Sequence, residues 1–297
     1  MKGWTLWFKL VLGGILIVVV PLLVTGIISA VKSSNALNAV AESQVVDTAR
    51  QISDVVKLVL SEEMKIAVDL SSDPHTVQLA ADIAKNGIGK AVAEVGSLDN
   101  KLTGFMTKTG NDYEGLFITD SNGTIYADGN GGGYKGIKIA DREYFKTAKG
   151  GKVNVGDVIK SKKTDQTVVT VCAPIMSGAG EFLGALAVVI KLDFVANKVA
   201  SVKIGLTGFS FMVDKSGLII AHPKKELVFA LNISQQDGLQ EVAKNMLSLR
   251  TGSDSYVFQG VKKVVGYAPV EMTGWSIAVS QNADEFLGPA HAPLPGF

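Results

Sequence analysis

The stretch GLFITDSNGTIYAD, residues 115–128, recurs as GFSFMVDKSGLIIAHP at residues 208–223. Each copy has an apolar run, an Asp-x-x-Gly sequence and a second apolar run; in the first copy the two polar positions are Asp120 and Gly123. An aspartate at the start of a turn accepts hydrogen bonds from nearby backbone N–H groups, and glycine adopts positive φ without strain. The pattern therefore predicts two β-hairpins of the same design.

The repeat continues beyond the hairpins. TVVTVCAPIMSGAGEFLGALAVVI, residues 167–190, parallels KKVVGYAPVEMTGWSIAVSQ, residues 262–281, and both contain an apolar strand, Ala-Pro, a turn with glycine and another strand. The offset is about 95 residues in both places, so whole units repeat. Each unit is predicted to be an antiparallel sheet with helices inserted between its second and third strands, which makes the fold class α+β.

The N-terminal region carries a candidate membrane span. Residues 10–31, LVLGGILIVVVPLLVTGIISAV, contain no charge and are long enough to cross a hydrocarbon core about 30 Å thick. Lys2 and Lys9 precede them, so residues 1–9 are expected to stay in the cytoplasm and the rest of the chain to be exported. A cleaved signal peptide ending near Ile28-Ser29-Ala30 is the alternative, but its apolar core would be unusually long. We expect a retained, single-pass anchor in the cytoplasmic (inner) membrane, with the remainder in the periplasm or extracellular space.

A long stalk helix is predicted over residues 33–72, which lack glycine and proline. Its apolar positions alternate at spacings of four and three, as in a coiled-coil seam: Val45, Ala49, Ile52, Val56 and Val59. Such a seam packs either on a partner helix, giving a homodimer, or on the chain's own domain, and the pattern leaves both open. Asp73-Pro74 ends the helix, and a second helix is predicted from about His75 to Glu94.

Composition and motifs argue against several classes. Lysine plus arginine nearly balance aspartate plus glutamate, for a formal charge of +1, so a nucleic-acid partner is not expected. The single cysteine, Cys172, lies in an apolar run and is expected to be a buried small hydrophobe; the three histidines follow no metal-ligand spacing, so neither metal nor cofactor is predicted. Motifs of hydrolases, metalloproteases and P-loop enzymes are absent from the sequence, so we do not expect an enzyme. The glycine-rich DGNGGGYKG, residues 128–136, is interpreted as a flexible turn.

Two segments of the chain resemble a known family. IADREYFKTAKGGKVNVGDVIKSKKTDQTVVTVCAPI, residues 139–175, is similar to the membrane-distal unit of double-Cache (tandem PAS-like) sensors, and residues 191–223 are similar to the passage into their membrane-proximal unit. The resemblance implies a distal unit at 73–200, a proximal unit at 201–288 and a tail at 289–297. It also implies the ligand-sensing region of a bacterial methyl-accepting chemotaxis receptor, or of a histidine kinase or diguanylate cyclase.

In that family the ligand lies in the distal unit, between the sheet and the helical insert. The best candidates are Arg142, whose guanidinium can hold a carboxylate by two hydrogen bonds, and Tyr144 and Phe145, which could wall an apolar pocket. Asp141 is placed to N-cap the helix that begins here. The alternatives are a surface or structural ion pair for Arg142 and ordinary core packing for Phe145.

Three further residues are candidates. Tyr126 lies on the second strand of the first hairpin, Asp157 could be a ligand contact or a turn former, and Lys160 belongs to a turn of lysines that could add positive potential or simply be solvated. Amino-acid sensors of the family carry a tyrosine where this chain has Ile137, and an ammonium-binding aspartate at about Val189. The departures favour a small carboxylate without an amino group, or another small anion.

Two broader alternatives remain open at this stage. The chain could be a membrane-anchored scaffold that binds no small ligand. The resemblance also implies a second membrane crossing and an output domain, whereas this sequence ends in APLPGF, as expected of a fragment, a truncated product or a stand-alone sensor.

Overall fold

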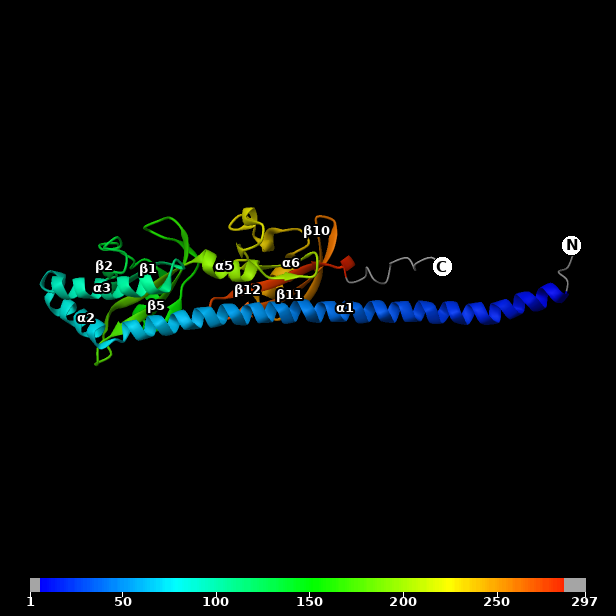
Figure 1. Cartoon of the computed structure of the whole chain (residues 1–297), viewed down its shortest axis with the longest axis horizontal. Helices are drawn as coiled ribbons and strands as arrows, with labels where there is room; N and C mark the ends of the chain where they lie inside the picture. The colour runs from blue at the N-terminus through cyan, green and yellow to red at the C-terminus, as the bar shows by residue number, and fades with distance from the viewer. Residues whose placement is uncertain (1–5, 286–297) are drawn as a thin grey trace.

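The computed structural model describes residues 6–285, which form two antiparallel sheets lying along one long helix (Figure 1). The first sheet contains β1 (Tyr113–Asp120), β2 (Ile125–Asp128), β3 (Asn154–Val155), β4 (Ile159–Lys160), β5 (Thr167–Met176) and β6 (Phe182–Lys191). The second contains β7 (Lys203–Ile204), β8 (Gly208–Val213), β9 (Ile219–Ala221), β10 (Gly252–Phe258), β11 (Val261–Val270) and β12 (Trp275–Asn282). The helices are α1 (Leu6–Ser71), α2 (Pro74–Asn86), α3 (Val92–Thr109), α4 (Glu143–Lys149), α5 (Leu192–Ala200) and α6 (Gln240–Leu247), with 3-10 turns at Ile88–Lys90, Lys225–Leu227 and Ile233–Gln235. The predicted α+β class is confirmed.

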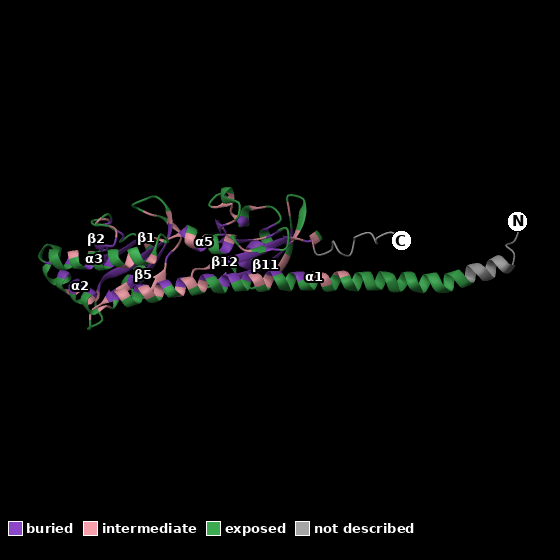
Figure 2. Cartoon of the chain, in the orientation of Figure 1, coloured by how far each residue is buried: buried purple, intermediate pink, exposed green. Residues whose placement is uncertain are grey.

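Helix α1 joins the predicted membrane span and the predicted stalk in one continuous element of 66 residues, about 100 Å long. From residue 14 to the start of the stalk its side chains are exposed and apolar, and this part projects beyond the sheets (Figure 2). It is long and apolar enough to cross a membrane. Residues 1–5 of the predicted cytoplasmic segment and the predicted tail, 289–297, lie outside the described residues.

The two sheets have the same topology, so the internal repeat is a repeat of fold. In the first sheet the strand order is β2-β1-β6-β5-β3, and β4 also pairs with β5. In the second sheet the strand order is β10-β11-β12-β8-β7, and β9 also pairs with β8. In each, the hairpin is followed by a helical insert, as predicted, and the insert is followed by a three-stranded meander. Every pairing is antiparallel.

The two hairpin turns are built identically. Asp120 Oδ1 accepts from the backbone N–H groups of Asn122 (2.9 Å) and Thr124 (2.8 Å), and Gly123 has φ of 79°. In the second unit Asp214 Oδ1 accepts from residues 216 and 218 at 2.8 and 3.0 Å, and the glycine there has φ of 85°. The Asp-x-x-Gly prediction is confirmed in both units. The turn could be predicted because every group that it needs lies within five residues of chain.

The apolar seam of α1 packs on the chain's own sheets. Val45, Ala49, Ile52 and Val56 are buried in the apolar core that α1 shares with both units, and β11 is the strand that α1 contacts most. The approach is close enough that a Cβ at Gly266 of β11 would lie 2.3 Å from the Val45 carbonyl carbon. Of the two partners that the heptad pattern left open, the structure shows the intramolecular one.

The segment after the stalk forms two helices where one was predicted. Asp73 caps α2 as expected, accepting from the backbone N–H of Thr76 at 3.2 Å. Gly87, with φ of 80°, then ends α2 and turns the chain into α3, which runs to Thr109. Positive φ cannot continue a right-handed helix, so this glycine divides the predicted helix.

Each sheet is covered on both faces. One face, together with α1, α2, α3 and α5, belongs to a continuous apolar core that spans both units. The other face is covered by the insert of its own unit: α4 and the 128–139 loop in the first, and α6 with its neighbouring turns in the second. Cys172 is fully buried on the α4 side, as expected, and burial raises the pKa of its thiol.

Candidate ligand-binding site

A narrow hollow, with a cavity volume of about 30 Å³, lies between the first sheet and its insert. Half of its lining consists of pure hydrocarbon side chains: Phe117, Ile125, Ile137, Ile139, Ile159, Val168 and Val189. The remaining lining residues are polar or charged: Tyr134, Arg142, Tyr144, Lys160, Ser161, Lys162 and Thr170. Apolar walls with a few converging polar groups are typical of a site that binds and orients a small molecule.

Arg142 lies at the edge of this hollow, at the N-cap of α4, and is half-buried. Its Nη2 donates to the carbonyl oxygen of Lys160 at 3.2 Å. Across residues 14–285 no carboxylate lies within ion-pair distance of this guanidinium; its neighbour Asp141 pairs instead with Lys162, at 2.7 Å. The guanidinium therefore keeps most of its donors available for an anion.

The prediction that Asp141 caps α4 was wrong. The cap position is Arg142, with extended backbone, and no side chain caps the helix. The ion pair with Lys162 draws the Asp141 carboxylate across to the β4–β5 turn, and this lysine is the main reason that the pKa of Asp141 is lowered. A tertiary partner has replaced the local one.

Tyr144 and Phe145 occupy adjacent positions with different surroundings. Tyr144 is buried in the wall of the hollow, packed against Gly156, where a Cβ would lie 3.0 Å from the tyrosine Cβ. Burial raises its pKa, so the phenol stays protonated and can donate a hydrogen bond. Phe145 is 2 % exposed and packs edge-to-face on Phe182, with ring centroids 5.8 Å apart, and is not among the residues lining the hollow.

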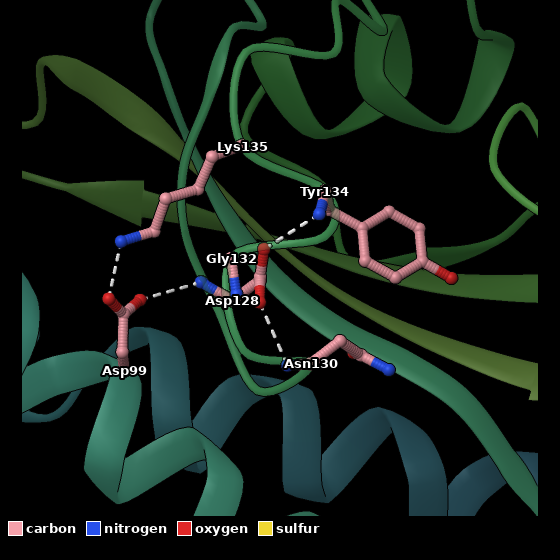
Figure 3. A network of polar contacts seen from close by, with 6 residues as sticks. All are labelled: Asp99, Asp128, Asn130, Gly132, Tyr134 and Lys135. Carbon is pink, nitrogen blue, oxygen red and sulfur yellow. Dashed lines mark hydrogen bonds and ion pairs between the residues drawn. The ribbon is translucent and has the colours of Figure 1, made fainter.

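The glycine-rich segment after β2 forms turns, as interpreted from the sequence, and its hydrogen bonds support the site. The buried Asp128 carboxylate accepts from the backbone N–H groups of Asn130, Gly132 and Tyr134, each at 2.8 Å (Figure 3). The Asp99 carboxylate of α3 accepts a hydrogen bond from the Asp128 backbone N–H at 2.9 Å and also forms an ion pair with a lysine of the loop. The loop winds around one carboxylate and so delivers the Tyr134 ring to the hollow.

Sequence reasoning missed a buried carboxylate beside the hollow. Glu114 is 7 % exposed, and its Oε1 accepts from the Tyr134 hydroxyl at 2.7 Å and from the Ser161 hydroxyl. It occupies a β-bulge of β1, between the pairs Tyr113–Ile190 and Gly115–Val189. The bulge is a feature of strand register, and no local motif announces it.

The other sequence candidates lie in different places. Lys160 lines the hollow through the segment that receives Arg142, and its side chain is exposed. Asp157 is ion-paired at 2.7 Å with Lys215 of the second unit's hairpin turn, away from the hollow. Tyr126 is buried in the core on the α1 side, and its hydroxyl has no partner among the described residues.

The second unit has its own hollow, with a cavity volume of about 50 Å³, at the equivalent place between sheet and insert. Its lining is almost wholly apolar, with His222 and Lys263 as the exceptions besides a buried tyrosine. His222 accepts from the Lys224 backbone N–H at 2.8 Å and contacts the Phe209 ring edge-on, and burial lowers its pKa. These contacts give His222 a structural role.

Fold and hollow together define a class: a pair of PAS-like units on a long, partly apolar helix, with a hollow under the insert of the first unit. A family model described as "Cache domain" matches residues 33–290, and the chain belongs to that family. Its sequence is 23 % identical over 282 residues to the methyl-accepting chemotaxis protein McpA of Bacillus subtilis, covering 93 % of this chain and 39 % of that protein. A similar protein of Bacillus thuringiensis, described as a probable methyl-accepting chemotaxis protein, is 21 % identical over 95 % of this chain and 40 % of its own length.

Solved structures agree in fold. The sensory domain of the Campylobacter jejuni chemoreceptor Tlp3 superposes with a TM-score of 0.66 at 15 % identity, covering 86 % of this chain and 98 % of that domain. The ligand-binding domain of the Pseudomonas aeruginosa amino acid chemoreceptor PctB, in complex with L-Arg, gives a TM-score of 0.59 at 19 % identity, covering 86 % of this chain and 99 % of that domain. The chain spans about two fifths of the length of the curated relatives it matches.

Proposed function

We propose that this chain is the extracytoplasmic ligand-sensing region of a chemotaxis-type transmembrane receptor, and that it binds a small molecule carrying a carboxylate in the hollow of its first unit. The proposal takes residues 10–31 as the membrane span, 33–72 as the stalk, 73–200 as the membrane-distal unit and 201–288 as the membrane-proximal unit. It assigns the chain a binding role and no catalytic role. Methyl-accepting chemotaxis relatives favour this output over the kinase or cyclase alternative.

One observation carries the proposal: the half-buried guanidinium of Arg142 stands at an apolar hollow without a carboxylate partner among residues 14–285. Arginine presents a planar fork of donors that matches a carboxylate, and its single contact to a carbonyl leaves that fork largely unused. The Tyr144 hydroxyl and the backbone around Lys160 add polar groups beside it. A ligand carboxylate at Arg142 would satisfy the charge that the protein leaves open.

We also propose that two copies associate along α1, with the sensor outside the cytoplasmic membrane. Because the heptad seam is occupied by the chain's own sheets, the contact would use the outward face of the helix. Val55 and Leu58 lie there one turn apart, 47 % and 61 % exposed. Exchange of both for glutamate should lower the oligomeric state measured by light scattering if this face is the interface.

The test of ligand binding uses the full chain in lipid nanodiscs. Thermal unfolding is followed with short carboxylates and amino acids, for wild type, Arg142→Ala and Asp157→Ala. A ligand at about 100 times its dissociation constant stabilises a protein by roughly 2.7 kcal/mol, which is an easily measured shift. We expect the shift to disappear in Arg142→Ala and to persist in Asp157→Ala. A panel that shifts neither wild type nor control would reject ligand sensing at this site and favour a scaffold.

A further inference from the structure

The two units meet at a cleft with a cavity volume of about 560 Å³. The first unit contributes the start of β5 and the end of β6, and the second contributes the end of β9 and the turn that follows it. Helix α5, which joins the units and contacts strands of both, also lines the cleft (Figure 1). Small-molecule sites occupy roughly 300–1,000 Å³ and occur preferentially at domain interfaces. The cleft therefore has the volume and the position of a small-molecule site.

An aromatic residue in an unusual backbone conformation, Phe229, lines this cleft. Its φ is 60°, in the left-handed region that bulky residues rarely adopt, and 41 % of the residue is exposed. The Phe229 N–H donates to the Ile219 carbonyl oxygen at 2.9 Å, which holds this conformation. Apolar side chains continue the lining on both sides of the ring: Leu192, Ile220 and Val228. An exposed ring held in a costly conformation beside an apolar wall suits a ligand that carries a ring of its own.

Two lysines at the cleft have no carboxylate partner. Lys191 is half-buried, and its Nζ donates to the Asn111 carbonyl oxygen at 2.7 Å, whereas Lys225 is exposed. Across residues 14–285 neither ammonium lies within ion-pair distance of a carboxylate. One carboxylate, that of Asp193 in the first turn of α5, also lines the cleft. Two ammonium groups against one carboxylate leave the lining positively charged, which favours an anionic ligand.

His222 lines both the cleft and the hollow of the second unit. Its Nδ1 accepts from the Lys224 backbone N–H at 2.8 Å, so the proton of the neutral ring is on Nε2. Burial lowers the pKa of His222, so the ring is neutral at pH 7 and Nε2–H is a donor. Across residues 14–285 no protein group accepts a hydrogen bond from this Nε2–H. One nitrogen therefore fixes the ring, and the other leaves a donor available to a ligand.

We propose that the cleft between the units is a second ligand site and that it binds a ring-bearing organic acid. The ring packs on Phe229 and on the apolar side chains of α5 and β9, and the carboxylate lies among Lys191, Lys225 and the Nε2–H of His222. This site is separate from the one proposed at Arg142, which lies under the insert of the first unit. Because both units line the cleft, a bound ligand favours the arrangement of the two units that forms it.

The size and the charge of the cleft each predict a preference among acids and their derivatives. A short acid such as acetate would fill little of the 560 Å³ and would leave Phe229 uncovered. Burial of apolar area contributes much of the affinity in such sites, so a ring-bearing acid should bind more tightly than acetate. The neutral amide of the same acid would cover the ring but would leave both lysines without a counter-charge.

Isothermal titration calorimetry on the full chain in lipid nanodiscs tests these preferences, with empty nanodiscs as the blank for partition into lipid. The probes are 3-phenylpropanoate and indole-3-acetate, the neutral amide of each, and acetate. We expect each ring-bearing acid to bind on the order of tenfold more tightly than its amide, as for hydrogen bonds between charged groups, and acetate to bind more weakly than either acid. An amide that binds as tightly as its acid would contradict the anionic ligand. If neither acid binds, the second site is refuted.

Phe229→Gly removes the ring without leaving a strained backbone. Glycine adopts a φ of 60° freely, which offsets the lost packing of the ring, so the variant should stay folded by circular dichroism and thermal unfolding. It should bind the ring-bearing acids on the order of tenfold more weakly. Leu249→Gly is the matched control, because Leu249 is also an exposed apolar residue with positive φ, 53°, and does not line the cleft. This control should keep the wild-type affinity.

Charge variants locate the carboxylate and separate this proposal from the one at Arg142. Lys225→Gln should weaken the acids by about two- to fivefold, the range for an exposed ion pair, and leave their amides unchanged. Lys262→Gln, at an exposed lysine outside the lining, should change neither. Arg142→Ala should leave the ring-bearing acids unaffected. If Arg142→Ala abolishes their binding and Phe229→Gly does not, they bind in the hollow of the first unit, so the second site is refuted and the carboxylate site stands.

Discussion

Replacing Asp128 by alanine should destabilise the first unit strongly, because one carboxylate holds the loop that carries Tyr134. Three backbone N–H groups donate to it at 2.8 Å (Figure 3). Tyr134 is buried, so its N–H loses the full value of a bond to a charged acceptor, about 1.5–3 kcal/mol. The other two donors belong to partly exposed residues that water can reach, and each loses about 0.5 kcal/mol. The sum is about 3 kcal/mol.

The assay is thermal and urea unfolding of the full chain, where a loss of about 3 kcal/mol corresponds to roughly 6–12 °C in Tm. Asp99→Ala is the control: it removes the acceptor of one N–H, at 2.9 Å, and an ion pair at the rim, and should cost about 1.5 kcal/mol, the low end for a charged acceptor because the Asp99 side chain is partly exposed. Asp128→Asn should fall between the two, because its NH₂ would face the Tyr134 N–H. If Asp128→Ala cost no more than the control, the loop would not depend on this carboxylate and the reasoning would be refuted.

Three further predictions concern α1 and the core. Gly266→Ala places a methyl group 2.3 Å from the α1 backbone and should cost at least about 2 kcal/mol in urea unfolding, whereas Gly104→Ala, in open space on α3, should be neutral or stabilising; equal effects would contradict the close packing. Burial raises the pKa of Glu63 against the hydrogen bond from Tyr113, so the folded state holds its proton more tightly. Protonation of Glu63 should therefore stabilise the folded wild type at acid pH, and this stabilisation should be lost as pH rises above 4.5, the ordinary pKa of a glutamate. A Glu63→Gln variant whose free energy of unfolding changes with pH as steeply as that of wild type would refute this. Cys172 should react with maleimide only when urea unfolds the chain, because its thiol is fully buried with a raised pKa; rapid labelling of the native protein would contradict that burial.

Several features were predictable because the groups that create them are close in sequence. The hairpin turns need only an aspartate, a glycine and the N–H groups between and just after them, so the Asp-x-x-Gly pattern predicts them twice. The repeat of strands, Ala-Pro and turns predicted two units of like topology, and their strand orders agree. The uncharged run before the stalk predicted an apolar helix, and α1 shows it exposed and continuous with the stalk.

Where a local signal competed with a tertiary partner, sequence reasoning was ambiguous or wrong. The heptad pattern of α1 could not distinguish a partner helix from the chain's own sheet, since both bury the same face. Asp141 has the position of a helix cap, yet its carboxylate pairs with Lys162, twenty-one residues away. The glycine-rich segment has the composition of a turn and forms one, but its composition does not show that the turn winds around the buried Asp128 carboxylate.

The sequence by itself determined the two-unit fold, the apolar helix and the stretch around Arg142 as the place to look for a ligand. Only the tertiary structure brought Glu114, Tyr134 and Ser161 together, and it moved Asp157, Phe145 and Tyr126 out of the candidate site. The physical reason is the range of the interactions. Turns and helices depend on hydrogen bonds between near neighbours in the chain. The polar groups of the hollow depend instead on a β-bulge and on a hydrogen bond between Glu114 and Ser161, which are forty-seven residues apart.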